Sequence, residues 1–148
     1  MHIREATERD AGALKALYFE HLTAHPPAEA QDMAAWRKKL RAFCEDENYH
    51  LLALEEDGQV VASVTLVVIP NLTHNLRPYA IVENVVTHRD HRGRGYATAL
   101  MRRAAEIAKE SNCYKIMLMT GSKRESTLGF YRKCGFNSED KTGFVMWL

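Results

Sequence analysis

The sequence has almost no net charge and no long apolar run. Its 20 Lys and Arg residues nearly balance 19 Asp and Glu residues, which leaves a formal net charge of +1. A chain so nearly neutral has no global attraction for nucleic acid or for an acidic membrane surface. Its longest apolar stretches, such as Val64–Pro70, are far too short to cross a bilayer. The N-terminal stretch MHIREATERD contains no apolar signal region, so we expect a cytoplasmic protein.

Cysteine is scarce, and no pair of cysteines has a metal-ligand spacing. The only cysteines are Cys44, Cys113 and Cys134, an odd number at scattered positions. This pattern favours free, buried thiols over a disulfide framework. The seven histidines include a single His-x3-His spacing, His21 and His25, and no Cys-x2-Cys pair is present. We therefore expect no bound metal ion.

Length and composition are those of one globular domain. The chain has 148 residues, of which 46% are hydrophobic and 26% charged, enough to bury a core. No internal repeat, low-complexity tract or long linker divides it. We therefore assign residues 1–148 to a single domain.

Apolar periodicity and turn residues predict an alternation of strands and helices. Early strands followed by a strand–helix–strand crossover predict a mixed α/β layered fold, in which strands 79–87 and 114–119 run parallel. Ser122-x-x-Glu125 resembles a capping box for the last helix, which Gly135 would end. The expected elements are a strand His2–Ala6, a helix capped by Thr7 or Asp10 and ended by Pro26, a helix Ala30–Glu45, a hairpin Tyr49–Leu54 and Gln59–Ile69, a strand Tyr79–Thr87, a helix Gly95–Glu110, a strand Tyr114–Met119, a helix from Ser122, and a strand Phe144–Leu148.

The stretch from Val85 to Leu100 reads as a strand end, a short polar turn and the start of a long helix. A helix start leaves backbone N–H groups without partners, and the helix dipole adds positive charge there. Gly93 and Gly95 would let a ligand approach the backbone closely. The guanidinium groups of Arg92 and Arg94 suit phosphate oxygens. The turn is therefore a candidate diphosphate-binding site, although a basic, solvated turn would have the same composition.

Two motifs in this order resemble the GNAT superfamily of acyl-CoA-dependent N-acetyltransferases. The segment 92–97, RGRGYA, matches the signature Arg/Gln-x-x-Gly-x-Gly/Ala, and the later segment Gly129–Phe136, GFYRKCGF, also resembles that family. The resemblance implies a central mixed, mostly antiparallel sheet with helices on both faces and a splayed pair of parallel strands. It also implies acetyl-CoA as co-substrate, with its pantetheine arm entering between the splayed strands.

The same resemblance assigns the residues that would contact acetyl-CoA. The diphosphate would lie over the turn and the first helical turn, and the pantetheine arm would pair with the backbone of the preceding strand. Thr127 stands where the family usually has a cofactor-contacting Asn. The implied cofactor-binding residues are Val85, Val86, Thr87, Arg92, Gly93, Arg94, Gly95, Tyr96, Ala97, Thr98 and Thr127.

Two side chains are candidates for proton transfer. Tyr131 falls where these enzymes commonly keep an acid, and a phenol could hydrogen-bond the thiolate as it leaves. The alternative for Tyr131 is a core position with its hydroxyl on a backbone carbonyl. Glu83 interrupts an apolar strand, and by strand alternation it would share a face with Val85 and Thr87 and act as the base. Glu83 could instead pair with an arginine such as Arg77 or Arg132, or a water could serve as the base.

The sequence indicates the amine that accepts the acetyl group less clearly than it indicates the donor. The sequence also resembles glucosamine-6-phosphate N-acetyltransferases, although it departs from them at Met119, Thr120 and Thr127. We expect a primary amine of a small molecule to attack acetyl-CoA directly in a ternary complex. The alternatives are a non-catalytic acyl-CoA sensor and acetylation of a protein or peptide amine. The C-terminal strand would offer an edge for homodimer pairing.

Overall fold

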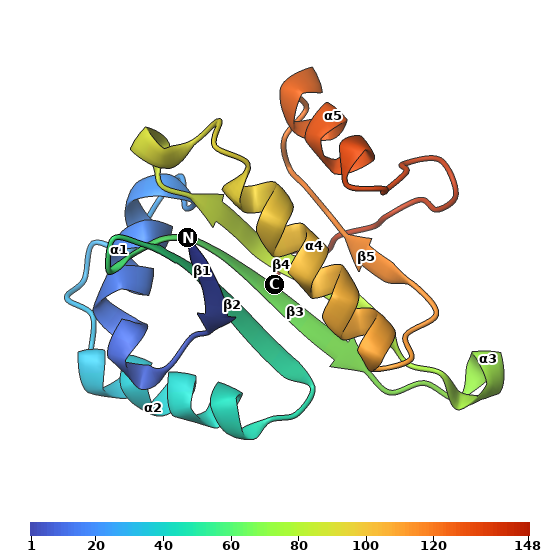
Figure 1. The fold of residues 1–148 in the computed structure, drawn as a ribbon, viewed down its shortest axis with the longest axis horizontal. Helices are drawn as coiled ribbons and strands as arrows, with labels where there is room; N and C mark the ends of the chain where they lie inside the picture. Colours follow the sequence, from blue (N-terminus) through green and yellow to red (C-terminus); the bar gives the residue numbers. More distant parts are fainter.

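The computed structural model describes residues 1–148, and it is built on one five-stranded sheet with the order β1-β2-β3-β4-β5 (Figure 1). Adjacent strands from β1 to β4 are antiparallel, whereas β4 and β5 run parallel. The mixed, mostly antiparallel sheet is therefore as predicted. The strands are β1 His2–Glu5, β2 Tyr49–Glu56, β3 Gln59–Ile69, β4 Tyr79–Thr87 and β5 Ile116–Leu118.

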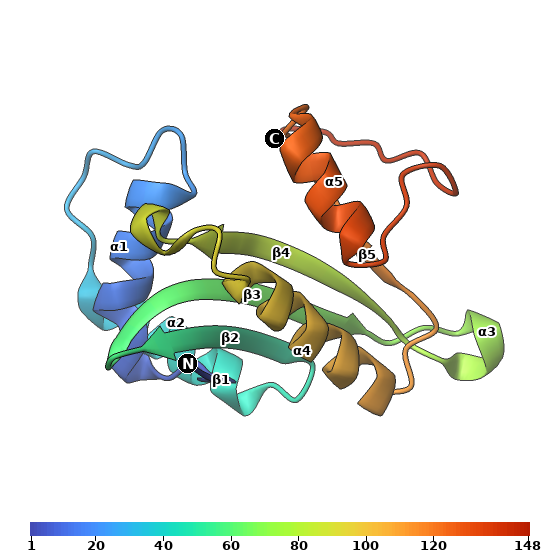
Figure 2. The same cartoon turned by 45° about the horizontal axis from the view of Figure 1, so that its top comes forward.

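Helices cover both faces of the sheet, and α4 crosses the face opposite α1 and α2 (Figures 1 and 2). Each face has its own buried cluster, one containing Leu100 and Ala104 of α4 and the other containing Leu14 of α1 and Leu40 of α2. No helix has the length and apolar character needed to cross a membrane. The helices are η1 Glu8–Asp10, α1 Ala11–His21, α2 Met33–Glu45, α3 Thr73–Leu76, η2 Arg89–His91, α4 Tyr96–Glu110 and α5 Glu125–Lys133.

The β2–β3 hairpin forms as predicted around an Asp-Gly turn. Asp57 and Gly58 both have positive φ, of 51° and 77°. Such a turn matches the twist of the flanking strands, and Asp-Gly adopts it at little cost. The hairpin places Glu56, at the end of β2, beside the start of α4.

Two helix starts were predicted wrongly. The second helix begins at Met33 rather than Ala30, because the Asp32 carboxylate caps it by accepting from the N–H groups of Ala34 and Ala35. The last helix begins at Glu125, so Ser122 is not its cap; the Ser122 hydroxyl instead accepts from the Arg124 N–H. The predicted C-terminal glycine, Gly135, is confirmed: its φ is 95°, and the Phe136 N–H closes the helix on the Tyr131 carbonyl.

The predicted strand Phe144–Leu148 is absent. Residues 141–148 have no regular structure, and no backbone hydrogen bond joins them to another strand. A strand exists only when a neighbouring strand satisfies its N–H and C=O groups, and β5 ends after Leu118 without pairing to this segment. Five apolar residues are consequently exposed to solvent, Phe144, Val145, Met146, Trp147 and Leu148.

Candidate active site

The parallel strands β4 and β5 separate soon after they meet. Only Ala80–Val82 of β4 pair with β5, whereas β4 itself continues to Thr87. Beyond Val82 the edge of β4 that faces β5 therefore has no partner strand. The splayed pair is as predicted, and its free edge includes Val85, Val86 and Thr87, where the resemblance places the pantetheine arm.

A β-bulge interrupts β4 at this opening. Thr65 of β3 pairs with Glu83, but Ser63, two residues away, pairs with Val86, so β4 carries one extra residue. Asn84 takes up this residue in a left-handed conformation, with φ of 53°. Because of this extra residue, the side chains of β4 before and after Asn84 do not follow the usual alternation between the two faces of the sheet.

The bulge places Glu83 and Val85 on opposite faces, so the prediction of a shared face was wrong. The Ser63 hydroxyl contacts Tyr18 of α1 at 3.3 Å, which puts Ser63 and its partner Val86 on the α1 face. Glu83 is on the same face, because its partner Thr65 lies two residues from Ser63 along β3. Val85 instead packs against the cluster on the α4 face.

The Arg-Gly turn presents a row of unpartnered backbone N–H groups. Gly93 and Gly95 have φ of 76° and 80°, and α4 begins at the next residue, Tyr96. From Gly93 to Thr98, no backbone N–H donates a hydrogen bond to any protein group. A methyl group at Gly93 or Gly95 would meet no protein atom within 4 Å, so the space above the turn is open. The turn therefore fits a diphosphate, which binds where several N–H groups converge at the start of a helix.

The side chains of this turn are partly engaged within the protein. Arg92 donates from Nε to the Thr87 carbonyl at 3.2 Å. Arg94 donates from Nη1 to the Glu56 carboxylate at 3.1 Å, and the Tyr96 hydroxyl donates to the same carboxylate. The sequence prediction missed Glu56, because nothing in the sequence indicates that the end of β2 lies next to the turn.

Tyr131 and Thr127 lie four residues apart on α5, on the same side of the helix. Tyr131 is half-buried between Phe130 and Phe136, with ring centroids 5.0 and 6.4 Å away. Its hydroxyl makes no hydrogen bond with a protein group, so the alternative of a bond to a backbone carbonyl is not realised. Burial raises the pKa of Tyr131, and the charge of Glu83 raises it further.

Glu83 is exposed, and neither of the arginines considered as its partner binds it. Arg77 donates to the carbonyls of Asn112 and Cys113, and Arg132 pairs with Glu125 at 2.6 Å. Glu83 therefore remains an unpaired carboxylate at the opening between β4 and β5. It lies near enough to Tyr131 to influence the pKa of the phenol.

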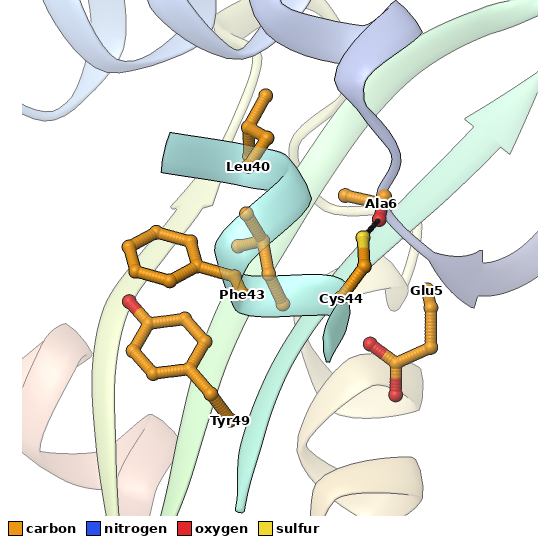
Figure 3. A pocket seen from close by; sticks show the side chains of 7 residues that line it. Glu5, Ala6, Leu40, Phe43, Cys44 and Tyr49 are labelled. Carbon is orange, nitrogen blue, oxygen red and sulfur yellow. Dashed lines mark hydrogen bonds between the residues drawn. The ribbon is translucent and has the colours of Figure 1, made fainter. Parts of the chain in front are cut away.

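The cysteines are all free, as predicted, but the prediction that they are buried was wrong: Cys44 is exposed, and Cys113 and Cys134 are half-buried. Cys134 packs against the cluster on the α4 face, and burial raises the pKa of its thiol. Cys44 donates to the Ala6 carbonyl beside a small apolar cavity of about 10 Å³ between α2 and β2 (Figure 3). That volume holds about one water molecule, so this cavity is no substrate site.

A larger cleft of about 430 Å³ lies between α1 and the start of β3. Its lining is polar and includes Arg9, Glu20, His21 and His88, but none of the predicted site residues. The structure also brings together no group of three His, Cys, Asp or Glu side chains that could hold a metal ion. Glu83 and the free edge of β4 lie instead at the β4–β5 opening.

A splayed parallel pair, a β4 bulge and a glycine turn opening a helix occur together here. Residues 13–136, most of the chain, match the model of the acetyltransferase (GNAT) family. The chain belongs to the GNAT family of acetyltransferases. It is therefore an acetyltransferase, and the acyl donor used by this family is acetyl-CoA.

Similar proteins agree with this assignment. The chain is 30% identical to glucosamine 6-phosphate N-acetyltransferase of Trypanosoma brucei brucei, over 82% of this chain and 79% of that protein. It is 32% identical to probable glucosamine 6-phosphate N-acetyltransferase 2 of Oryza sativa subsp. japonica, over 89% and 78% of the two chains. The structure of a putative acetyltransferase from Agrobacterium tumefaciens str. C58 is 38% identical, covers 100% of both chains and superposes with a TM-score of 0.88.

Proposed function

We propose that this GNAT acetyltransferase transfers the acetyl group of acetyl-CoA to the primary amine of a small molecule, by direct attack in a ternary complex. One observation carries the proposal. The row of free N–H groups from Gly93 to Thr98 adjoins the free edge of β4, and that edge leads to the opening between Glu83 and Tyr131.

The backbone would bind the donor. The N–H groups at the start of α4 would hold the diphosphate, with Arg92 adding positive charge. The free edge of β4 at Val85–Thr87 would pair with the amides of the pantetheine arm, as an added strand pairs with a sheet edge. Thr127 would line the other side of the opening from α5. Donor binding would thus depend mainly on main-chain groups.

The two candidate catalytic side chains approach the opening from different elements. Glu83, on the α1 face of β4, would accept a proton from the ammonium so that the amine nitrogen has a lone pair. That nitrogen attacks the thioester carbonyl, the C–N bond forms and the C–S bond breaks. Tyr131, from α5, would donate a hydrogen bond or its proton to the departing sulfur. Bringing both reactants together in one site would supply much of the rate.

Direct attack is favoured over an acyl-cysteine intermediate by the state of Cys134. Burial raises the pKa of this thiol, and a nucleophilic cysteine requires the opposite shift. A Cys134→Ala variant should therefore keep turnover, and abolished turnover in that variant would contradict direct attack.

The acceptor is proposed to be a small-molecule amine because the relatives named above are glucosamine 6-phosphate N-acetyltransferases. The test is thiol release from acetyl-CoA against a panel of amino sugars with and without phosphate, polyamines, amino acids and peptides. Turnover with a small amine supports the proposal. Turnover restricted to peptides would refute the small-molecule acceptor, and tight CoA binding without any turnover would identify a sensor.

We further propose that the protein is a homodimer. Phe144 and Trp147 are 88% and 89% exposed in the single chain. β5 is also an edge strand, with β4 on one side and no strand on the other. An apolar segment and a free sheet edge are complementary. If the segment of one copy pairs as a strand with β5 of another, it satisfies the backbone groups of that edge and its own side chains become covered.

A further inference from the structure

Glu56 connects the β2–β3 hairpin to the turn proposed to bind the diphosphate. It ends β2, and its side chain is 22% exposed. One carboxylate oxygen accepts from His91 Nδ1 at 2.9 Å and from Arg94 Nη1 at 3.1 Å, and the other accepts from the Tyr96 hydroxyl. The three contacts lie before, within and after the glycine turn, so a single carboxylate holds the whole turn.

Without these contacts the turn would be held mainly by local bonds. The local bonds are those of Arg92 to the carbonyls of Thr87 and Arg89, and a long contact of 3.4 Å from Arg94 Nη2 to the Asp90 carbonyl. Two glycines at positive φ make the intervening backbone more flexible than an ordinary turn. Ordering it upon ligand binding costs free energy, which a preformed turn avoids.

The contacts of Glu56 also determine where the side chains of the turn point. The Arg94 guanidinium and the Tyr96 phenol are both directed to the carboxylate, and Tyr96 is only 7% exposed. Neither side chain then occupies the space above the N–H groups. The charge of Arg94 is also largely balanced by Glu56, which leaves phosphate recognition to the main chain and Arg92.

We propose that Glu56 is a positioning residue for donor binding: it holds Arg94 and Tyr96 away from the cofactor side and keeps the N–H groups of the turn preorganised for the diphosphate of CoA. The inference rests on the proposed binding of CoA at this turn. Glu56 acts through the turn and touches neither the thioester nor the amine. Its loss should therefore change donor affinity and leave the chemical step nearly unaltered.

The first experiment measures the Kd for CoA by titration calorimetry in the wild type, Glu56→Ala and Glu56→Gln. The alanine variant should bind CoA about tenfold more weakly, because the turn loses its order and the Arg94 side chain is no longer held clear of the N–H groups. The glutamine variant keeps an acceptor for Tyr96 and should lose only about threefold. Glu55→Gln is the matched control, because Glu55 is the adjacent residue of β2 but pairs with Arg4, away from the turn. It should bind CoA as the wild type does.

The second experiment separates positioning from general destabilisation. With Glu56→Ala, the KM for acetyl-CoA should rise about tenfold, whereas kcat and the KM for the amine should change less than about twofold. In addition, Tyr96→Phe should weaken CoA binding in the wild type but have little further effect in Glu56→Ala, because residues that act through one contact are not additive. Thermal unfolding of each variant establishes that binding is measured on folded protein.

Each outcome has a distinct meaning. A wild-type protein that does not bind CoA overturns the proposed function and this inference with it. A wild type that binds CoA, together with a folded Glu56→Ala variant of equal affinity, leaves the proposed function intact and overturns the inference. A fall in kcat with an unchanged KM for acetyl-CoA, or additive effects of Glu56→Ala and Tyr96→Phe, would also overturn it.

Discussion

The free hydroxyl of Tyr131 is the feature that most distinguishes a catalytic from a structural tyrosine here. The ring is held by Phe130 and Phe136, yet the oxygen has no partner in the protein. Tyr131→Phe should keep this packing and lower kcat by about 10- to 100-fold, because a donor to the leaving sulfur is lost. The Kd for CoA should change less than about twofold.

Tyr114→Phe is the matched control, because Tyr114 stacks on His74 at 3.8 Å in a different aromatic cluster. An unchanged kcat in Tyr131→Phe would assign Tyr131 to the core. Because burial raises the pKa of Tyr131, the phenol stays protonated up to and beyond its ordinary value of about 10. The wild-type rate should therefore show no loss from ionisation of Tyr131 between pH 7 and about pH 9.

Glu83 should contribute as a base only where the amine is still protonated. Glu83→Gln should lower kcat/KM by about 100-fold near pH 7, because the ammonium loses its proton acceptor. The deficit should shrink as the pH approaches the pKa of the amine, where free amine is already present. A pH series of thiol-release rates measures this convergence.

Glu125→Gln serves as the control for Glu83→Gln, since Glu125 is also exposed but pairs with Arg132 on α5. A Glu83→Gln deficit of less than about threefold at every pH would indicate that water is the base. A large deficit that does not depend on pH would instead mean that Glu83 orients the acceptor.

At the level of the elements, the glycine turn makes a prediction of its own. Gly95 has φ of 80° and open space above it. Gly95→Val would put a branched side chain into that space and strain the backbone by about 1–2 kcal/mol. Binding of CoA should fall at least about 100-fold, because the diphosphate could no longer approach the N–H groups.

Gly135→Ala is the control for strain, because Gly135 also has positive φ and open surroundings but lies at the end of α5. It should reduce stability with little change in CoA affinity. Titration calorimetry and thermal unfolding of both variants distinguish the two effects. Unchanged CoA affinity in Gly95→Val would place the diphosphate elsewhere.

The sequence predicted the elements whose signals are local. The Asp57–Gly58 hairpin, the strand Tyr79–Thr87 and the αL glycine at Gly135 all form where turn chemistry and periodicity placed them. The bulge at Asn84 was not predicted, because one extra residue in β4 is visible only in its register with β3. That register decides which face Glu83 occupies.

Glu56 was missed for a related reason. Its three partners are 35 to 40 residues away in sequence, and no local pattern links a hairpin end to a later turn. The same limit applies to Phe144–Leu148, whose alternation is compatible with a strand. A strand forms only where another strand pairs with it, and the single chain pairs none with this segment.

At the scale of the whole molecule, the C-terminal segment 144–148 determines how copies of the protein should associate. Monomeric proteins rarely leave several large apolar side chains exposed in a row, because about 25 cal/mol is gained per Å² of apolar surface buried. A second copy supplies both an apolar surface and the free edge of β5. Wild-type protein should therefore have twice the mass of one chain in light scattering at about 10 μM, because many specific dimers have a Kd below that concentration.

Replacing Phe144 and Trp147 together by Glu should convert the dimer to a monomer, because two charges cannot be desolvated in an apolar contact without a partner. Leu72→Glu is the matched control: Leu72 is 87% exposed on the β3–β4 loop, outside segment 144–148. It should leave the mass unchanged. If the wild type has the mass of one chain at every concentration, segment 144–148 is not a dimer contact.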